Sequence, residues 1–274
     1  MDNDTSPPPS LPACARLPIN RCNLPAVILG SLTYQQHPTP LMLDGLGDLH
    51  RYLWQHLDTL DTPELRAEDF KAYMRGHFCL DDLSACGLEG DGGRGNADYL
   101  RLVRGWWFNP DGREAAVLKG WVESRFGLMT RFHRQPLTDN EGEGYARFMH
   151  ERTCGLYNTN ALESQMDLLF GFCQYELGRQ YPEQTHLTLY RGVNGLEDHE
   201  VLWRRGKRAV VLFNNVNAFS SHRERADEFG DYILTVRVPL AKVCCFQELL
   251  PGLLRGEGEH LVIGGVYEVS LSTL

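Results

Sequence analysis

The spacing of apolar residues changes near His186, and this change constrains the fold more than any other feature of the sequence. Before it, apolar residues recur every three to four positions, as on one face of an α-helix. After it, short runs alternate between apolar and polar side chains, as in half-buried β-strands. Helices followed by strands, without regular alternation of the two, favour an α+β fold over a doubly wound parallel sheet.

The periodic segments give expected positions for the main elements. Thr62 and Pro63 supply the capping hydroxyl and first-turn proline that start a helix. We expect helices within 44–86, 96–107, 113–126 and 161–177. We expect strands at 26–29, 187–191, 209–213, 216–220, 232–238 and 261–270. The expected organisation is an extended, partly disordered segment at 1–43, a helical region at 44–135 packed on a core, and that core at 136–274, unless 11–274 is one continuous domain.

Composition excludes several classes of protein. The 274 residues include 27 basic and 36 acidic side chains, a net charge of −9, which argues against nonspecific binding to nucleic acid. No apolar run approaches the roughly 20 residues that cross a bilayer. The first nine residues are acidic and proline-rich, unlike a secretory signal. These features predict a cytoplasmic protein that acts on a protein or a small molecule.

The eight cysteines are scattered and include no Cys-x-x-Cys pair. Neither a zinc site nor a disulfide framework is indicated, so we expect free thiols that are mostly buried. Nothing in the sequence requires a metal. Trp106, Trp107, Phe108 and Trp121 form an aromatic cluster that we expect in the core rather than on a binding surface.

Three polar motifs follow one another in the strand-rich part of the chain. Arg191-Gly192 ends a predicted strand, Phe219-Ser220-Ser221 ends another, and Glu257-Gly258-Glu259 leads into the last. A Glu-x-Glu pair alone is weak evidence, because about one residue in four is charged in ordinary proteins. An isolated pair is therefore interpreted as a solvated turn, and the two upstream motifs are what favour a reactive site.

The order of these motifs resembles the Arg-Ser-Glu signature of NAD-dependent mono-ADP-ribosyltransferases, over about the last ninety residues. The whole chain also resembles the dinitrogenase reductase ADP-ribosyltransferases, a bacterial family that switches nitrogenase off by modifying an arginine of its iron protein. The resemblance implies two small, mostly antiparallel sheets that form an NAD cleft, with a helical N-terminal half packed against them. It further implies NAD as a consumed substrate, the nitrogenase iron protein as acceptor and a PII-type signalling protein as regulator.

The resemblance gives the two glutamates different roles. Glu259 would hydrogen-bond the ribose of NAD and stabilise the positive charge that develops on it. Glu257 would bind the acceptor guanidinium and take its proton, since a free guanidinium is a poor nucleophile. Because side chains alternate along a strand, we expect both carboxylates on one face. His260 should then point away from the site.

The resemblance also assigns the two upstream motifs to the parts of NAD other than the ribose. The resemblance implies that Arg191, beside Gly192, binds the pyrophosphate with its planar fork of donors. It implies that Ser220 positions the catalytic glutamate, that Phe219 lies beside NAD and that Phe229 stacks on nicotinamide. The Ser-Thr-Ser of the family is Ser-Ser-His in this chain, which keeps the first serine.

The sequence is also compatible with two alternative functions. One keeps the chemistry with another acceptor, as in a toxin-like transferase or an NAD glycohydrolase that uses water. The other is an inactive NAD-binding regulatory module, against which the presence of Arg191, Ser220, Glu257 and Glu259 together argues. The basic stretch Arg204–Arg208 is either a solvated loop or a docking site for an acidic partner surface.

Overall fold

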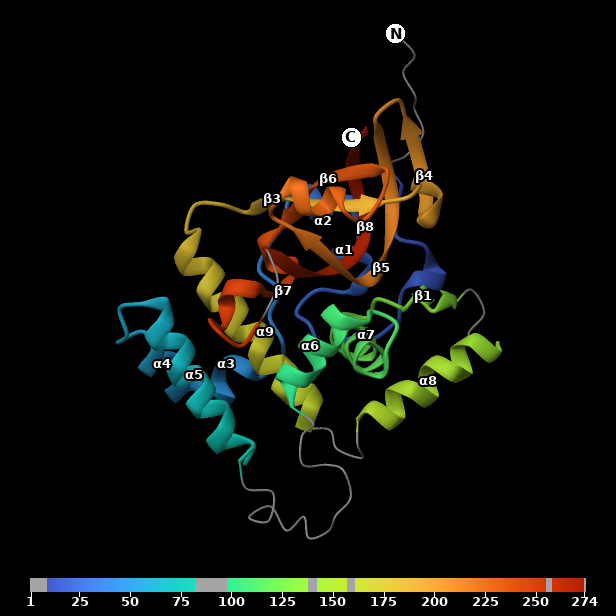
Figure 1. Ribbon diagram of the computed structural model, residues 1–274. Helices are drawn as coiled ribbons and strands as arrows, with labels where there is room; N and C mark the ends of the chain where they lie inside the picture. The colour runs from blue at the N-terminus through green and yellow to red at the C-terminus, as the bar shows by residue number, and fades with distance from the viewer. Residues whose placement is uncertain (1–8, 82–97, 138–141, 157–160, 255–257, 274) are drawn as a thin grey trace.

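A helical N-terminal half is followed by a sheet built from the C-terminal part of the chain (Figure 1). The computed structural model describes residues 9–81, 98–137, 142–156, 161–254 and 258–273. Within these ranges the order of elements confirms the α+β prediction. No helix among the described residues combines the length and the apolar character needed to cross a bilayer.

Capping residues mark one end of each of the helices α5, α6 and α7. Thr62 accepts a hydrogen bond from Leu65 N at the start of α5, Asp98 accepts one from Arg101 N at the start of α6, and Gly127 ends α7 with a φ of 70°. The described helices are α1 (Ala26–Leu29), α2 (Leu32–Gln36), α3 (Leu46–Leu49), α4 (Arg51–Leu57), α5 (Pro63–His77), α6 (Tyr99–Phe108), α7 (Arg113–Phe126), α8 (Glu143–Gly155), α9 (Ala161–Gln180) and α10 (Arg223–Asp227).

Six strands form one curled antiparallel sheet: β3 (His186–Val193), β4 (Glu200–Arg205), β5 (Arg208–Ser220), β6 (Tyr232–Pro239), β7 (Val243–Phe246) and β8 (Glu259–Thr273). β5 pairs along most of its length with β8, whose other edge pairs with β7 and β6. β6 pairs with β3, and β3 meets β5 again where Tyr190 lies opposite Ser220. The sheet therefore curls until its strands close on themselves.

The prediction of two small sheets differs from this arrangement. The long strands β5 and β8 run through the whole sheet, and irregular register between Phe213 and Val216 bends β5 without ending it. The segments predicted separately at 209–213 and 216–220 are therefore one strand. A further pair, β1 (Phe132–His133) and β2 (Gln135–Pro136), forms a separate small hairpin.

Three local features of the structure bear on the sequence predictions. Residues 26–29 form a helical turn after Pro25, which supplies the fixed φ of a helix start, rather than a strand. The basic stretch Arg204–Arg208 forms the exposed tip of the hairpin of β4 and β5, which fits its interpretation as a solvated loop and leaves the docking alternative untested. β7 was missed because all four of its residues are buried, so it lacks the alternation that marks a half-exposed strand.

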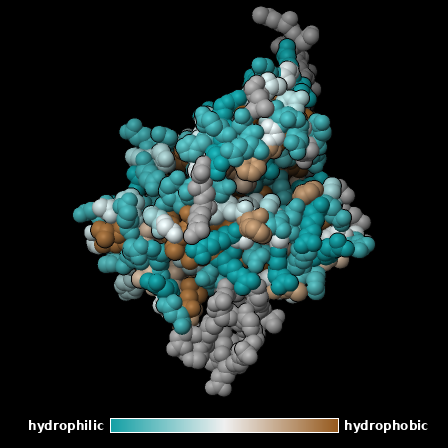
Figure 2. Space-filling view, viewed as in Figure 1, coloured by the Kyte–Doolittle hydropathy of each residue, from teal (hydrophilic) through white to brown (hydrophobic). Residues whose placement is uncertain are grey.

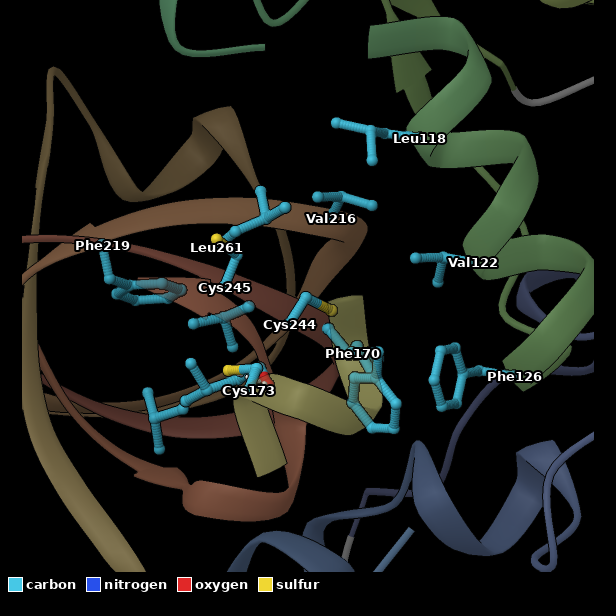
Figure 3. Packing of buried hydrophobic residues seen from close by; sticks show 14 of the residues in the cluster. Leu118, Val122, Phe126, Phe170, Cys173, Val216, Phe219, Cys244, Cys245 and Leu261 are labelled. Atoms are coloured by element: carbon cyan, nitrogen blue, oxygen red, sulfur yellow. Dashed lines mark hydrogen bonds between the residues drawn. The ribbon is translucent and has the colours of Figure 1, made fainter. Parts of the chain in front are cut away.

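The main core lies between the sheet and the long helices α7 and α9 (Figure 3). Phe126 of α7 meets Phe170 of α9 edge to face, with ring centroids 5.3 Å apart. Cys173 of α9 packs near Cys244 and Cys245 of β7. The described cysteines are free as predicted, but only these three are buried; Cys14 is exposed and Cys22, Cys79 and Cys154 are half-buried.

Buried ion pairs fix α9 to its neighbours. Arg66 of α5 donates two hydrogen bonds to Glu176, at 2.5 and 2.9 Å. Arg125 of α7 donates two to Asp167, both at 2.8 Å. Such bidentate pairs fix orientation as well as distance. The helical half is thereby held in a defined position against the sheet that α9 contacts.

Lys242 is fully buried between the sheet and α2 without a carboxylate partner among the described residues. Its Nζ donates to Gly264 O at 2.8 Å and lies over the rings of Tyr34 and Tyr267, 5.5 and 4.6 Å from their centroids. Burial lowers the pKa of Lys242 to about 7. Protonation of this amine in the folded protein is therefore opposed by its surroundings.

We expect this lysine to make stability rise with pH above neutrality. Its folded pKa of about 7 lies below the unfolded value of 10.5, so between these values the unfolded state binds more protons. In urea unfolding at pH 7, 8 and 9, the free energy of unfolding of the wild type should rise relative to that of Lys242→Met, by about 1 kcal/mol per pH unit. Exposed Lys207→Met is the control; parallel pH profiles for all three proteins would contradict the assignment.

Candidate active site

A cavity of about 380 Å³ lies where β3, β5 and β8 meet α10 and the end of α6. Its walls come from segments that are far apart in the sequence. The lining residues are Trp106, Trp107, Pro110, Tyr190, Arg191, Gly192, Ala218, Phe219, Ser220, Arg225, Ala226, Phe229 and Glu259. Every predicted site residue among the described residues is therefore brought to this one cavity.

Strand pairing explains why the serine and the glutamate meet. Ser220, the last residue of β5, lies directly opposite Glu259, the first residue of β8. Directly opposed residues of an antiparallel pair carry their side chains on the same face, with Cβ atoms about 5 Å apart. Tyr190 of β3 lies opposite Ser220 on its other side. The register of three strands thus brings the serine and the carboxylate together.

Arg191 is held at the end of β3 by the neighbouring strand. Its Nη1 donates to Ala218 O at 2.7 Å, and the side chain is half-buried in the cavity wall. A Cβ atom on Gly192 would lie 2.0 Å from Ala226 O, so only glycine allows α10 to pack this closely on β3. This close packing places the residues of α10 beside the guanidinium.

Two cations and one carboxylate line the same cavity. Burial raises the pKa of Glu259, and the Arg225 guanidinium opposes that rise. Arg225 also pairs with Glu228, at 2.8 Å. The sequence prediction missed Arg225, which lies four residues before Phe229 in the segment that follows Ser220. Because α10 ends at Asp227, no shared helix face links Arg225 to Phe229.

The backbone just before Glu259 is held by side chains from three segments. Gly258 N donates to Gln247 Oε1 at 2.6 Å. Its carbonyl accepts from Ser221 N at 2.9 Å, from Ser221 Oγ at 3.3 Å and from His260 Nδ1 at 2.9 Å. Ser221, to which the resemblance gave no certain role, thus helps to fix the start of β8.

The expected alternation of Glu257 and Glu259 requires an extended chain at Gly258. Gly258 has a φ of 69°, in the left-handed region, and β8 begins only at Glu259. The chain is therefore not extended at Gly258. Glu257 itself lies outside the described residues, so a shared face for the two carboxylates stays a prediction.

The two phenylalanines line the cavity in different ways. Phe219 is 3% exposed and packs edge to face on Phe213, with ring centroids 5.5 Å apart. It therefore forms part of the buried wall. Phe229 also lines the cavity but is 68% exposed, so much of its ring is accessible to solvent.

The aromatic cluster of α6 is divided between core and cavity. Trp106 and Trp121 are buried as predicted, but Trp106 also lines the cavity with Trp107. The Nε1 atom of Trp107 is buried and has no hydrogen-bond partner within the described part of the chain. Phe108 is 92% exposed, so its expected place in the core is wrong.

His260 points away from this cavity, as predicted. It is buried, stacks on Phe246 and lines a second cavity of about 210 Å³ together with Ser221 and Glu248. Its Nδ1 donates to Gly258 O, so His260 contacts the backbone of the residue that precedes Glu259. It supports the start of β8 and does not line the cavity that holds Glu259.

Comparison with known proteins gives consistent results over most of the chain. The model of a family described as dinitrogenase reductase ADP-ribosyltransferase matches residues 19–271. The chain is 40% identical over 261 residues to NAD(+)--dinitrogen-reductase ADP-D-ribosyltransferase of Rhodospirillum rubrum, covering 93% of this chain and 95% of that protein. No solved structure matches the chain.

Proposed function

The chain belongs to the dinitrogenase reductase ADP-ribosyltransferase family, and from this membership we propose that it transfers ADP-ribose from NAD to an arginine of dinitrogenase reductase, the iron protein of nitrogenase. The R. rubrum relative carries the name of the same reaction. The observation that carries the proposal is the meeting of Arg191, Ser220 and Glu259 in one cavity.

The chemistry of the cavity fits NAD. The guanidinium groups of Arg191 and Arg225 suit a pyrophosphate, which Arg binds with two parallel hydrogen bonds. The buried indole N–H of Trp107 is a donor that an oxygen or nitrogen acceptor of the dinucleotide would satisfy. The exposed ring of Phe229 offers a stacking surface for nicotinamide.

Glu259 is the residue to which we assign the action on the ribose. Transfer breaks the bond between the ribose C1′ and the nicotinamide nitrogen, nicotinamide leaves with the bonding electrons, and a guanidinium nitrogen bonds to C1′. Positive charge develops on the ribose meanwhile, and the Glu259 carboxylate stabilises it. Ser220, directly opposite on β5, is the residue to which we assign the positioning of that carboxylate.

The acceptor side of the reaction is assigned to Glu257. A guanidinium has a pKa above about 12 and must lose a proton as it attacks, so an adjacent carboxylate both binds it and accepts the proton. This is why we propose arginine as the modified residue. Regulation by a PII-type protein and a cytoplasmic location are carried as further predictions from the family resemblance.

The proposal is tested by incubating the protein with NAD labelled in the ADP-ribose part and an extract of nitrogen-fixing cells. We expect one main labelled protein, dinitrogenase reductase, together with an equal amount of released nicotinamide. An NAD glycohydrolase would release nicotinamide and label no protein. Labelling of a different protein would keep the chemistry and overturn the acceptor.

Arg191→Ala is expected to weaken NAD binding by about 10- to 100-fold, because a charge-assisted contact worth about 1.5–3 kcal/mol is lost. Isothermal titration calorimetry of NAD measures this directly. Arg223→Ala is the matched control, since Arg223 lies on α10 but donates to Ser272 rather than lining the cavity. If folded Arg191→Ala binds NAD with an unchanged dissociation constant, Arg191 does not contact NAD and has a structural role instead.

A further inference from the structure

One exposed aromatic ring lies at the edge of the candidate active site. Phe108 is the last residue of α6 and is 92% exposed. Its neighbour Trp107 and the nearby Pro110 both line the cavity. Phe108 is not itself a lining residue, but it lies in the chain between two that are and is open to solvent, and we refer to this end of α6 as the rim of the cavity.

The exposure of Phe108 contrasts with the rest of its helix. The other large apolar residues of α6 are buried or half-buried: Tyr99, Leu100, Leu102, Val103, Trp106 and Trp107. After Phe108 the chain becomes extended at Asn109, with φ −153° and ψ 101°, so the helix ends with this ring turned to solvent. Aromatic side chains are enriched at the energetic centres of protein interfaces.

The rim of α6 is joined to the segment that leads into the two glutamates. Arg104 donates from Nε and Nη2 to Leu253 O, at 3.0 and 2.9 Å. This part of α6 is thereby tied to the backbone at Leu253, six residues before Glu259 in the sequence. Docking at this rim would place an incoming side chain relative to Glu259.

We propose that Phe108 is part of the docking surface for the protein acceptor, an inference that rests on the proposed function. The acceptor arginine has to reach the ribose beside Glu259, and it belongs to a folded protein. The surface around that arginine must therefore lie against the rim of the cavity. Phe108 is the large apolar side chain that α6 presents there.

Apart from Phe229, which lines the cavity itself, the other large apolar residues that are exposed in the described part of the chain do not line it. The face drawn in Figure 2 is mainly hydrophilic, with hydrophobic residues in small separate groups. Tyr52 of α4 is 85% exposed, and α4 packs on α5 without contributing to the cavity lining. Tyr52 is therefore a matched aromatic control for Phe108.

The test compares wild type, Phe108→Ser and Tyr52→Ser with two acceptors, purified dinitrogenase reductase and the small guanidine agmatine. For Phe108→Ser we expect kcat/KM for the protein acceptor to fall at least tenfold, while agmatine labelling and the KM for NAD stay unchanged. Phe108→Tyr should restore most of the protein labelling, because it keeps the ring. Tyr52→Ser should behave as wild type with both acceptors.

Two results would overturn this docking role. Wild-type labelling of dinitrogenase reductase by Phe108→Ser would show that the ring makes no useful contact. Equal losses with agmatine and with the protein would show that Phe108 supports the cavity itself. In both cases wild type still labels dinitrogenase reductase, whereas a wild type that labels neither acceptor would overturn the proposed function and the docking role with it.

Discussion

Glu259→Gln is expected to slow the release of nicotinamide from NAD by about 10²–10³-fold while the fold stays intact. Glutamine keeps the size and much of the hydrogen bonding of glutamate but removes the negative charge that faces the ribose. The lost electrostatic stabilisation amounts to roughly 3–4 kcal/mol. The half-buried position of Glu259 strengthens this effect, because few water molecules screen its charge there.

Steady-state nicotinamide release, with circular dichroism to check folding, measures this change. Glu224→Gln is the control, since Glu224 is an exposed carboxylate on α10 that does not line the cavity. Turnover like that of wild type in Glu259→Gln would remove Glu259 from the catalytic centre.

Glu257→Gln should separate the two halves of the reaction. Glu259 still faces the ribose in this variant, so slow hydrolysis of NAD by water should persist. Transfer to arginine should collapse, because both the anchor for the guanidinium and the acceptor for its proton are removed. The ratio of protein labelling to nicotinamide release is therefore expected to fall sharply.

Parallel assays of nicotinamide release and acceptor labelling on one preparation give that ratio. Gln247→Glu serves as a comparison, because it changes a neighbouring side chain but keeps an oxygen that can accept from Gly258 N. Equal losses in both activities for Glu257→Gln, or surviving arginine labelling, would contradict the division of roles between the two glutamates.

Local sequence signals predicted the regular elements well where they were strong. The bounds of α7 match because Gly127 ends it in the left-handed conformation, and β6 matches because its apolar residues alternate clearly. The strand β7 and the hairpin of β4 were not predicted. All residues of β7 are buried, and β4 is exposed at both ends with charged residues there. Neither strand therefore shows the alternation of a half-exposed strand.

The candidate site was predicted mainly through its order of motifs. Strand register then explains the meeting of Ser220 and Glu259, which spacing alone could not give. Trp107 enters the cavity from a helix that lies far earlier in the sequence. Its contribution depends on how the helical half packs on the sheet, and no local pattern of residues encodes that packing.

The direct test of the proposed function is peptide mapping by mass spectrometry of purified dinitrogenase reductase after incubation with this protein and NAD. We expect ADP-ribose on one arginine of the acceptor, formed in step with nicotinamide release and absent when Glu259→Gln replaces the wild type. An unmodified acceptor despite nicotinamide release, or ADP-ribose attached to a residue other than arginine, would contradict the assignment of this chain as a protein-arginine ADP-ribosyltransferase.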